Sequence, residues 1–287
     1  MENLSLSGGA FKASAFIGCI TYLEDHDMMK DIQNVIGSSA GAIIGMLICL
    51  GFNAAEMREF VVSELQGFID QEVELENLFN IFYSLGVDDG SNHVRVFEKA
   101  LSLKNIPINV TFGQLQDHSI RNLIICGSNL TTSEIEYFCA KNTPDMEVTM
   151  AVRISISIPF IVQPVFYNNM VYVDASLFNN NPSNYFEKNT LCLLISSPPS
   201  SAIASLEDLN LLSYTHLMMT SVFKRMNQKD LTTDLVVDIV IDDEDFDVET
   251  FKLRACVTDI DKYIAIGHAS ITHMMATMST KKQTLEV

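Results

Sequence analysis

The chain has 287 residues, of which 48% are hydrophobic and 19% are charged, and this is enough to bury a sizeable core. Its 13 glycines and 7 prolines are too few for a collagen-like or low-complexity chain. The formal net charge of −18 argues against nucleic acid as a partner, because such binding depends on clustered Lys and Arg, and against tight docking on an anionic membrane.

The hydrophobic pattern predicts strands that alternate with helices along the chain. A short strand over residues 3–6 precedes a helix that carries Phe16, Ile17, Ile20 and Leu23 at helical spacing. Further strands are expected at 35–36, 122–130, 134–140, 170–176, 191–197 and 235–242. Further helices are expected at 42–50, across 54–101 with a break near 86–92, around 150–157 and at 259–278.

This alternation predicts an α/β fold in which helices cover both faces of a mostly parallel sheet. No linker-like composition or charge run divides the sequence, so we expect a single domain over residues 1–287. The first residues lack the basic and apolar regions of a secretory signal, and the longest apolar segment, 42–52, is too short to span a bilayer. These features predict an intracellular, cytoplasmic protein without a signal peptide or a transmembrane helix.

Six cysteines are widely spaced, form no C-x-x-C pair and mostly have apolar neighbours. They are Cys19, Cys49, Cys126, Cys139, Cys192 and Cys256. This usage is typical of buried free thiols in a reducing compartment rather than of disulfides or a zinc site. The acidic run 242–247 lacks the glycine and the spacing of a calcium-binding loop, so we interpret it as a solvated loop and expect no metal site.

A serine lies among small residues where one apolar run turns into another, in Gly37-Ser38-Ser39-Ala40-Gly41. The G-x-S-x-G pattern is a weak signal by itself, but here a predicted strand precedes it and a predicted helix follows it, as a nucleophile elbow requires. The N-terminus of that helix would favour negative charge developing near Ser39. The alternative is a Gly/Ser turn that only leads into a core helix.

A serine nucleophile needs an oxyanion hole and a base. The segment SGGAFKA at residues 7–13 offers consecutive small residues between the first strand and the first helix. The backbone N–H groups of Gly8, Gly9 and Ala10 could converge there on an oxyanion, and Lys12 adds a positive charge close by. The alternative is a plain glycine turn between a strand and a helix.

The candidate base is an aspartate rather than a histidine. None of the six histidines has a context that favours a catalytic role: His26, His93, His118, His216, His268 and His273. Asp174 instead follows the apolar run Val-Tyr-Val directly, at the end of a predicted strand, where an α/β sheet places functional groups. The alternative for Asp174 is that it caps the Asn-rich turn that follows.

Together, these three segments resemble those of the patatin-like phospholipases. That family has a glycine-rich oxyanion segment ending in a basic residue, a G-x-S-x-G elbow some tens of residues later, and an Asp-Gly-Gly or Asp-Gly-Ala triplet far downstream. They are matched here by residues 7–13, by the elbow with its glycines Gly37 and Gly41, and by Asp174-Ala175-Ser176 with the Asn- and Pro-containing segment after it. The resemblance covers roughly residues 3–185 and is weaker near the end of the chain.

The resemblance implies a three-layer α/β/α patatin-like fold and a metal-independent serine lipid acyl hydrolase of the phospholipase A type, without a cofactor. Ser39 would attack an ester carbonyl while Asp174 accepts its proton, forming a Ser–Asp dyad, and the N–H groups of Gly8, Gly9 and Ala10 would bind the oxyanion. An exposed carboxyl is a poor base for a hydroxyl, so burial would have to raise the pKa of Asp174. Water activated by Asp174 would then hydrolyse the acyl-enzyme.

The resemblance also implies the substrate class, which is phospholipids or other acyl lipids reached through transient peripheral contact with a membrane. The apolar segment IPFIVQPVF at residues 158–166 either accepts an acyl chain beside the site or packs beneath the end of the sheet. Because of the negative net charge, we expect any interface binding to use apolar loops or zwitterionic lipid rather than basic patches.

The sequence departs from the family's pattern in two motifs. Ala10 and Ala13 stand where the family usually has glycine, and Ala175-Ser176 replaces two glycine-like positions. A Cβ at Ala10 would cost about 1 kcal/mol if the turn requires a positive φ. These departures support one alternative, a weakly active or inactive patatin-fold protein that binds lipid or a partner. A second alternative is a histidine-dependent esterase of the α/β-hydrolase type, which would need a catalytic histidine late in the chain.

Overall fold

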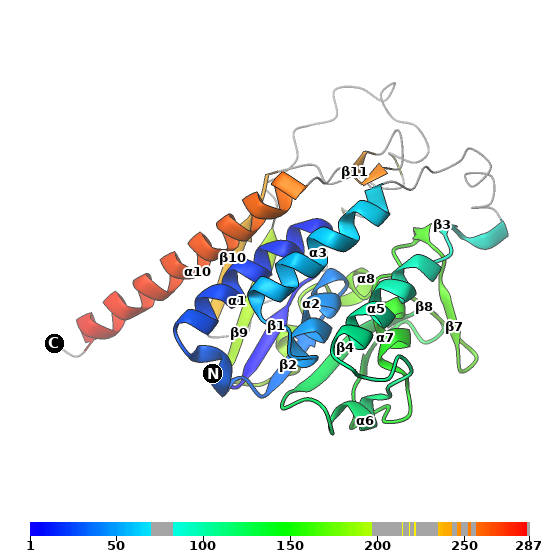
Figure 1. Cartoon of the computed structure of the whole chain (residues 1–287), viewed down its shortest axis with the longest axis horizontal. Helices are drawn as coiled ribbons and strands as arrows, with labels where there is room; N and C mark the ends of the chain where they lie inside the picture. Colours follow the sequence, from blue (N-terminus) through cyan, green and yellow to red (C-terminus); the bar gives the residue numbers. More distant parts are fainter. Residues whose placement is uncertain are drawn as a thin grey trace.

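A computed structural model of the chain describes residues 1–69, 83–196, 214, 218, 221, 235–242, 246–247, 252–253 and 257–285. Within these residues, a central sheet of eight strands has the order β10-β9-β1-β2-β4-β8-β7, with β5 paired to β4 (Figure 1). Its strands are β1 (Asn3–Leu6), β2 (Asn34–Gly37), β4 (Asn122–Asn129), β5 (Glu134–Phe138), β7 (Val165–Tyr167), β8 (Met170–Val173), β9 (Thr190–Ser196) and β10 (Leu235–Val240).

The middle of this sheet is parallel. β10, β9, β1, β2 and β4 pair in parallel in that order, and Leu6 at the end of β1 lies level with Gly37 of β2 and Leu193 of β9. β5, β8 and β7 extend it through antiparallel pairs. All four residues of β1 are buried, as expected for strands covered on both faces. The carboxyl ends of β1 and β2 therefore open toward the same edge of the sheet.

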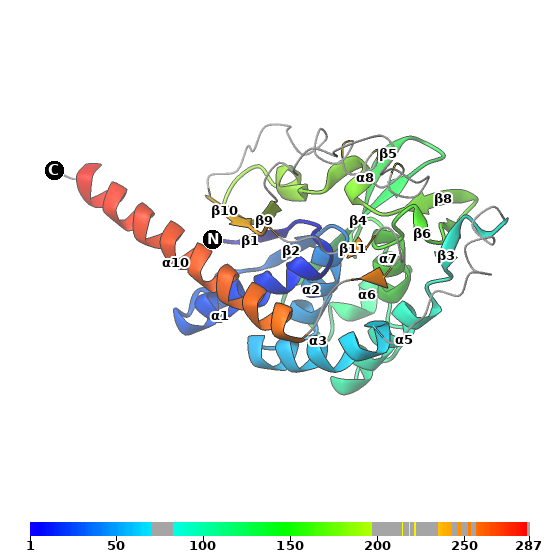
Figure 2. The ribbon, with the colours of Figure 1, turned by 90° about the horizontal axis from the view of Figure 1, so that it is seen from above.

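Helices flank the sheet on both sides (Figure 2). One face is covered by the long helices, and the other carries the short helices α8 and η3. The helices on the first face are α1 (Ala15–Asp25), α2 (Ala40–Cys49), α3 (Ala54–Ile69) and α10 (Val257–Leu285). The others that matter for the site are η1 (Ala10–Ser14), α5 (Ser91–Leu103), α7 (Val148–Ser155), α8 (Ser176–Asn179) and η3 (Pro182–Tyr185); η2 (Met28–Asp31) and α6 (Phe112–Leu115) lie in connections. The arrangement confirms the predicted α/β fold class.

Among the short strands that were not predicted, two pair with each other outside the main sheet. β3 (Gly86–Asp88) lies in the expected break between helices and pairs in parallel with β6 (Phe160–Val162), and together they form a separate two-stranded sheet. A Cβ at Gly86 would lie 2.5 Å from the backbone nitrogen of Gln163, so glycine allows this close pairing. Each strand has three residues, too few for a period-two pattern to be visible in the sequence.

Several smaller expectations also have an outcome. The five cysteines in the described part of the chain are free and buried, as predicted, whereas Cys256 lies outside it. The acidic run 242–247, which was expected to be a loop, is described only in part, and the loop expectation is wrong for Phe246–Asp247, which forms β11 and pairs with β12 (Lys252–Leu253). The last helix extends to Leu285, beyond the predicted end at 278. In the portions of the chain that the structure describes, no helix has the length and apolar character needed to cross a membrane.

Candidate active site

The turn between β2 and α2 holds Ser39 in an unusual backbone conformation. Ser39 has φ 52° and ψ −128°, a region that non-glycine residues seldom adopt. The neighbouring glycines let the chain pass closely: a Cβ at Gly41 would lie 2.5 Å from the carbonyl oxygens of both Leu6 and Ser7, and a Cβ at Gly37 would lie 2.4 Å from that of Gly41. The small residues of the predicted elbow are therefore required by sterics.

The side chain that this turn presents is hydrogen-bonded to the aspartate that follows β8. The Ser39 hydroxyl Oγ donates to Asp174 Oδ2 at 2.7 Å, although the two residues are 135 positions apart. Ser39 is 6% exposed and Asp174 is fully buried. The predicted nucleophile and the predicted base are thus in direct contact.

The second carboxylate oxygen of Asp174 is held by the start of α8. Oδ1 accepts hydrogen bonds from the backbone N–H of Ser176 at 2.8 Å and from the Ser176 hydroxyl. Burial raises the pKa of Asp174 to about 6, while the hydrogen bonds from Ser176 and Ser39 limit that rise. With Oδ1 occupied, Oδ2 remains for Ser39.

Two serines, Ser155 at the end of α7 and Ser157 two residues later, fix the backbone around this contact. The Ser39 N–H donates to Ser155 Oγ at 3.0 Å, and the Ala175 N–H donates to the Ser155 carbonyl at 3.2 Å. The Asp174 N–H donates to the Ser157 carbonyl at 2.8 Å. Sequence analysis assigned no role to Ser155 or Ser157; the only available signal was a Ser-x-Ser pair where a predicted helix ends.

The loop after β1 lies against the serine. A Cβ at Gly8 would be 3.0 Å from Ser39 Cβ and 2.2 Å from Asn180 Oδ1, so only glycine allows this approach. The Gly8 N–H, a predicted oxyanion donor, instead donates to the Asn180 carbonyl at 3.1 Å. This is a correction to the prediction for this conformation, and sequence analysis did not single out Asn180.

The next two N–H groups of that loop are available. In the described part of the chain, the N–H groups of Gly9 and Ala10 donate to no protein acceptor, because Gly9 is the N-cap and Ala10 the first residue of η1, and the first N–H groups of a helix have no intrahelical partner. Ala10 has φ 45°, so the turn does require the positive φ whose cost was anticipated. Lys12, the basic residue of the motif, is buried within η1.

The described histidines do not take part in this arrangement. No histidine in the described ranges is hydrogen-bonded to Ser39 or Asp174, and His216 lies outside those ranges. His93 lies beside Asp88, with 3.8 Å between Nδ1 and Oδ2, and burial lowers its pKa. Among the residues described, no three His, Cys, Asp or Glu side chains gather as potential metal ligands.

The apolar segment 158–166 does not pack entirely beneath the sheet. Phe160, the first residue of β6, is 45% exposed, and Phe166 on the edge strand β7 is 71% exposed. The segment starts one residue after Ser157, whose carbonyl accepts the hydrogen bond from Asp174. It therefore begins next to the site and carries large apolar side chains to the surface.

Comparison with known proteins gives one matching family model, that of the patatin-like phospholipases, over residues 4–186. Among curated proteins, "Probable lipid hydrolase 463L" of Invertebrate iridescent virus 6 is 29% identical over 183 residues, which are 63% of this chain and 61% of that protein. "Uncharacterized protein R571" of Acanthamoeba polyphaga mimivirus is 29% identical over 192 residues, 65% of this chain and 62% of that protein. The matches thus span less than two thirds of these relatives.

Two solved structures resemble the chain in fold. VipD from Legionella pneumophila aligns with a TM-score of 0.59 and 16% identity, covering 96% of this chain and 67% of that one. Full-length ExoU in complex with full-length SpcU, from the type III secretion system of Pseudomonas aeruginosa, aligns with a TM-score of 0.50 and 17% identity, covering 96% of this chain and 52% of that one. At such identities the likeness establishes the fold alone.

Proposed function

The chain belongs to the patatin-like phospholipase family, and from this premise we propose that it is a metal-independent lipid acyl hydrolase of the phospholipase A type. The single observation that carries the proposal is the 2.7 Å hydrogen bond from Ser39 Oγ to Asp174 Oδ2, made by a serine in a strained turn to a buried carboxylate. Backbone strain of this kind persists only where the surrounding structure enforces it, and residues strained in this way cluster at functional sites.

In the proposed acylation step, Ser39 Oγ attacks the ester carbonyl carbon and its proton passes to Asp174 Oδ2. The carbonyl oxygen becomes an oxyanion, which accepts hydrogen bonds from the N–H groups of Gly9 and Ala10. The N-terminus of α2, directly behind Ser39, favours this negative charge. The tetrahedral intermediate then collapses, the bond to the alcohol oxygen breaks, and Asp174 returns the proton to that oxygen.

Deacylation repeats the sequence with water as the nucleophile. Asp174 Oδ2 accepts a proton from water, the resulting hydroxide attacks the acyl carbon, and the fatty acid leaves as Ser39 Oγ recovers its proton from Asp174. A carboxyl group with a pKa of about 6 suits both steps, since it is mostly ionised at pH 7 and more basic than an exposed aspartate. No step in this scheme requires a metal ion or a cofactor.

The proposed substrates are phospholipids or other acyl lipids, contacted transiently at a membrane surface. The exposed side chains of Phe160 and Phe166 support apolar contact with lipid. The net charge of −18 favours zwitterionic over anionic headgroups.

A second candidate function is lipid or partner binding without turnover. The observation that favours it is the engagement of the Gly8 N–H by the Asn180 carbonyl, which leaves two oxyanion donors where three were predicted. Losing one such donor typically lowers the rate by about 10²–10³-fold. Retention of the contact between Ser39 and Asp174 favours the hydrolase.

The test is hydrolysis of a short-chain p-nitrophenyl ester and of phosphatidylcholine vesicles, with EDTA present. We expect wild-type turnover on at least one substrate, a loss of about 10⁴-fold or more in Ser39→Ala, and a loss of roughly 10²–10⁴-fold in Asp174→Asn. Equal activity in wild type and Ser39→Ala would contradict the proposal. A folded wild-type protein that is inactive on both substrates but binds the vesicles would favour the second candidate.

A further inference from the structure

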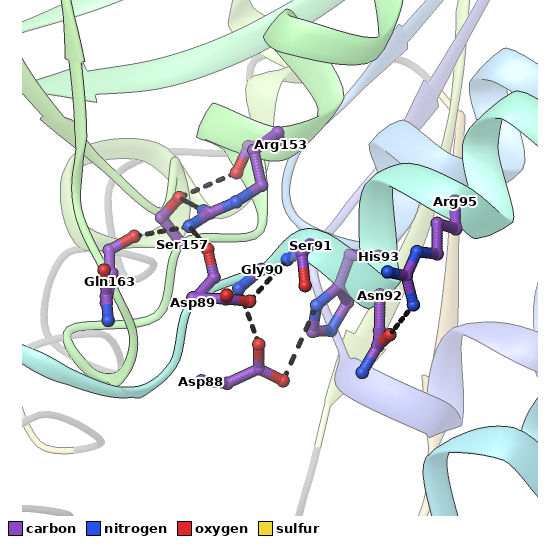
Figure 3. Close-up of polar contacts among 10 residues, drawn as sticks. All are labelled: Asp88, Asp89, Gly90, Ser91, Asn92, His93, Arg95, Arg153, Ser157 and Gln163. Carbon is purple, nitrogen blue, oxygen red and sulfur yellow. Dashed lines mark hydrogen bonds and ion pairs between the residues drawn. The ribbon is translucent and has the colours of Figure 1, made fainter.

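A buried guanidinium lies behind the candidate active site. Arg153, in the last turn of α7, is only 7% exposed, and its donors spread toward three acceptors (Figure 3). Nη2 donates to the backbone carbonyls of Asp89 at 2.9 Å and Gln163 at 2.8 Å, and Nη1 donates to Ser157 Oγ. Every acceptor in this set is neutral.

The three acceptors come from separate segments of the chain. Asp89 follows β3, Gln163 follows β6, and Ser157 follows α7. Gly90 completes the enclosure on one side: it has φ +78°, and a Cβ there would lie 2.0 Å from Arg153 Nε. One side chain therefore joins the two-stranded β3–β6 sheet to the end of α7.

Ser157 connects this arrangement to the candidate base. Its hydroxyl donates to the Arg153 carbonyl at 2.7 Å, so this hydroxyl is fixed both as an acceptor from the guanidinium and as a donor. Its own carbonyl accepts the Asp174 N–H at 2.8 Å, and Asp174 in turn accepts the Ser39 hydroxyl at 2.7 Å. The route from the guanidinium to the candidate nucleophile thus consists of three consecutive hydrogen bonds.

The buried charge of Arg153 is not expected to increase the stability of the fold. No carboxylate oxygen of a described residue lies within ion-pair distance of it, and burial lowers its pKa while Asp88 and Asp89 raise it. His93, next to Asp88, and Arg95 also lie on this side. A buried charge bonded only to neutral acceptors pays a large desolvation cost, and an apolar side chain of similar size would often stabilise the fold more. The planar fork of arginine is instead suited to fixing several acceptors at once.

From these contacts we propose that Arg153 is a positioning residue for the pair Ser39 and Asp174, acting through Ser157. By holding the Ser157 hydroxyl, it fixes the residue whose carbonyl binds the Asp174 backbone, and so it sets where Oδ2 lies relative to Ser39 Oγ. This inference rests on the proposed function and adds to it a residue that contacts neither the substrate nor the reacting atoms. A displacement of about 1 Å at a reacting group can cost about 10²-fold in rate, so the effect is measurable.

The first test compares Arg153→Met, which keeps much of the side-chain length but removes every donor, with Arg153→Lys, which keeps the charge. We expect kcat to fall by about 10–10²-fold in Arg153→Met with KM changed by less than about threefold, and by a smaller factor in Arg153→Lys. Leu101→Ala is the matched control, because Leu101 is fully buried in α5, which packs on α7, but forms no part of the hydrogen-bonded route. Well below its melting temperature, this control should retain kcat.

A second variant perturbs the same guanidinium from the other side. Gly90→Ala places a methyl group against Arg153 Nε, and we expect it to lower kcat in the same direction. If the two positions act through one route, the double variant Gly90→Ala/Arg153→Met will be no slower than Arg153→Met alone. Losses that multiply would overturn the proposed route. Should Arg153→Met fail to fold, Gly90→Ala and Arg153→Lys carry the test.

A measurement that needs no turnover separates this inference from the proposed function. In ¹³C-carboxyl NMR titrations of the full chain, Asp174 should titrate near pH 6 in wild type, and its pKa should fall in Arg153→Met as a displaced carboxylate gains water. An inactive wild type with this pKa difference would overturn the hydrolase but support the positioning role. An active wild type whose kcat and Asp174 pKa are both unchanged in Arg153→Met would overturn the positioning role alone.

Discussion

The two turns that follow β1 and β2 both contain a non-glycine residue in a strained backbone conformation, but they do so with different residues. The strands are parallel neighbours, with Leu6 level with Gly37, so both turns lie at one edge of the sheet. Each turn contains a non-glycine residue at positive φ, Ala10 at 45° and Ser39 at 52°. Such a conformation costs an L-residue about 1–2 kcal/mol, so both turns are strained.

What each turn gains from its strain differs. At Ser39 the strained backbone directs the side-chain hydroxyl to Asp174, so this turn serves to position a side chain. At Ala10 the side chain is exposed, and the turn instead presents the N–H groups of Gly9 and Ala10, which donate to no acceptor among the described residues. We therefore expect the elbow to be sensitive to side-chain changes and the first loop to be sensitive only to changes in its backbone.

The largest effect is expected from crowding the point where the two turns touch. Gly41→Ala places a Cβ 2.5 Å from the carbonyl oxygens of Leu6 and Ser7, and backbone atoms cannot move aside cheaply. We expect hydrolysis to fall to background and the free energy of unfolding to fall by about 2–4 kcal/mol, measured by urea denaturation.

Gly45→Ala provides the control on the same helix. Its Cβ would meet only side-chain atoms, the nearest being Val35 Cγ1 at 3.3 Å, and alanine favours helix more than glycine does. Stability should change by less than about 1 kcal/mol and activity should persist. If Gly41→Ala is as mild as Gly45→Ala, the two turns are not in the close contact described.

The pH dependence separates the elbow from its neighbour, because only Ser39 works through a titrating partner. Asp174 must be ionised to accept a proton, so kcat/KM should fall about tenfold per pH unit below its pKa of about 6. Replacements in the first loop should leave this acid limb in place. An acid limb near pH 4, the ordinary range of an exposed aspartate, would contradict the burial of the base.

The same group has a defined effect on stability. Its folded pKa of about 6 exceeds the unfolded value of about 3.9, so between these pH values the folded state binds more protons than the unfolded state. The contribution of Asp174 to the unfolding free energy is therefore greatest below pH 4 and declines by about 3 kcal/mol as the pH rises through 6. Urea denaturation at several pH values should show this decline in wild type, and Asp174→Asn should lack it.

A smaller effect isolates the strain at the elbow. Ser39→Gly and Ser39→Ala both remove the hydroxyl and its bond to Asp174, but only glycine tolerates φ 52° without a Cβ penalty. The greater chain entropy of glycine in the unfolded state offsets part of this relief, so we expect Ser39→Gly to be more stable than Ser39→Ala by about 1 kcal/mol in thermal or urea unfolding, with both inactive. Equal stability would mean that the backbone at this position is not strained.

The smallest effect is expected at Ala10. Ala10→Gly relieves the same kind of strain but adds chain entropy to the unfolded state, so the net stabilisation should be only about 0.5 kcal/mol. Activity should change less than about threefold, because the N–H donors stay in place. Ala10→Val is the contrasting variant: a β-branched residue at positive φ should destabilise the protein and lower turnover together.

The parts of the molecule that could be predicted are those with a local signal. Short apolar runs such as 3–6 and 122–130 became the strands of the main sheet. Ser39 was found from its G-x-S-x-G pattern between a predicted strand and a predicted helix, and Asp174 because it directly follows such a run. The contact between Ser39 and Asp174 was not predictable in the same way, because β8 runs antiparallel to β4 and places Val173 level with Ser128, near the carboxyl end of β4 and the elbow after β2.

The parts that could not be predicted depend on contacts between distant segments. β3 and β6 are three residues each and lie about 70 positions apart, so neither is recognisable alone. Four further residues matter through hydrogen bonds to or from backbone groups: Ser155, Ser157, Asn180 and Arg153. The Ser-x-Ser pair at a predicted helix end is too common a pattern to assign the two serines a role. The engagement of the Gly8 N–H by Asn180 is a further effect that only the tertiary structure shows.

The most direct test of the central claim, that Asp174 activates Ser39 as a nucleophile, is labelling with a fluorophosphonate followed by intact mass and peptide mapping. We expect one adduct on wild type at pH 8, mapped to Ser39, no adduct on Ser39→Ala, and a labelling rate at least about 10²-fold lower in Asp174→Asn. A folded wild-type protein that takes no label, or one that labels as fast when Asp174 is replaced by asparagine, would contradict the claim.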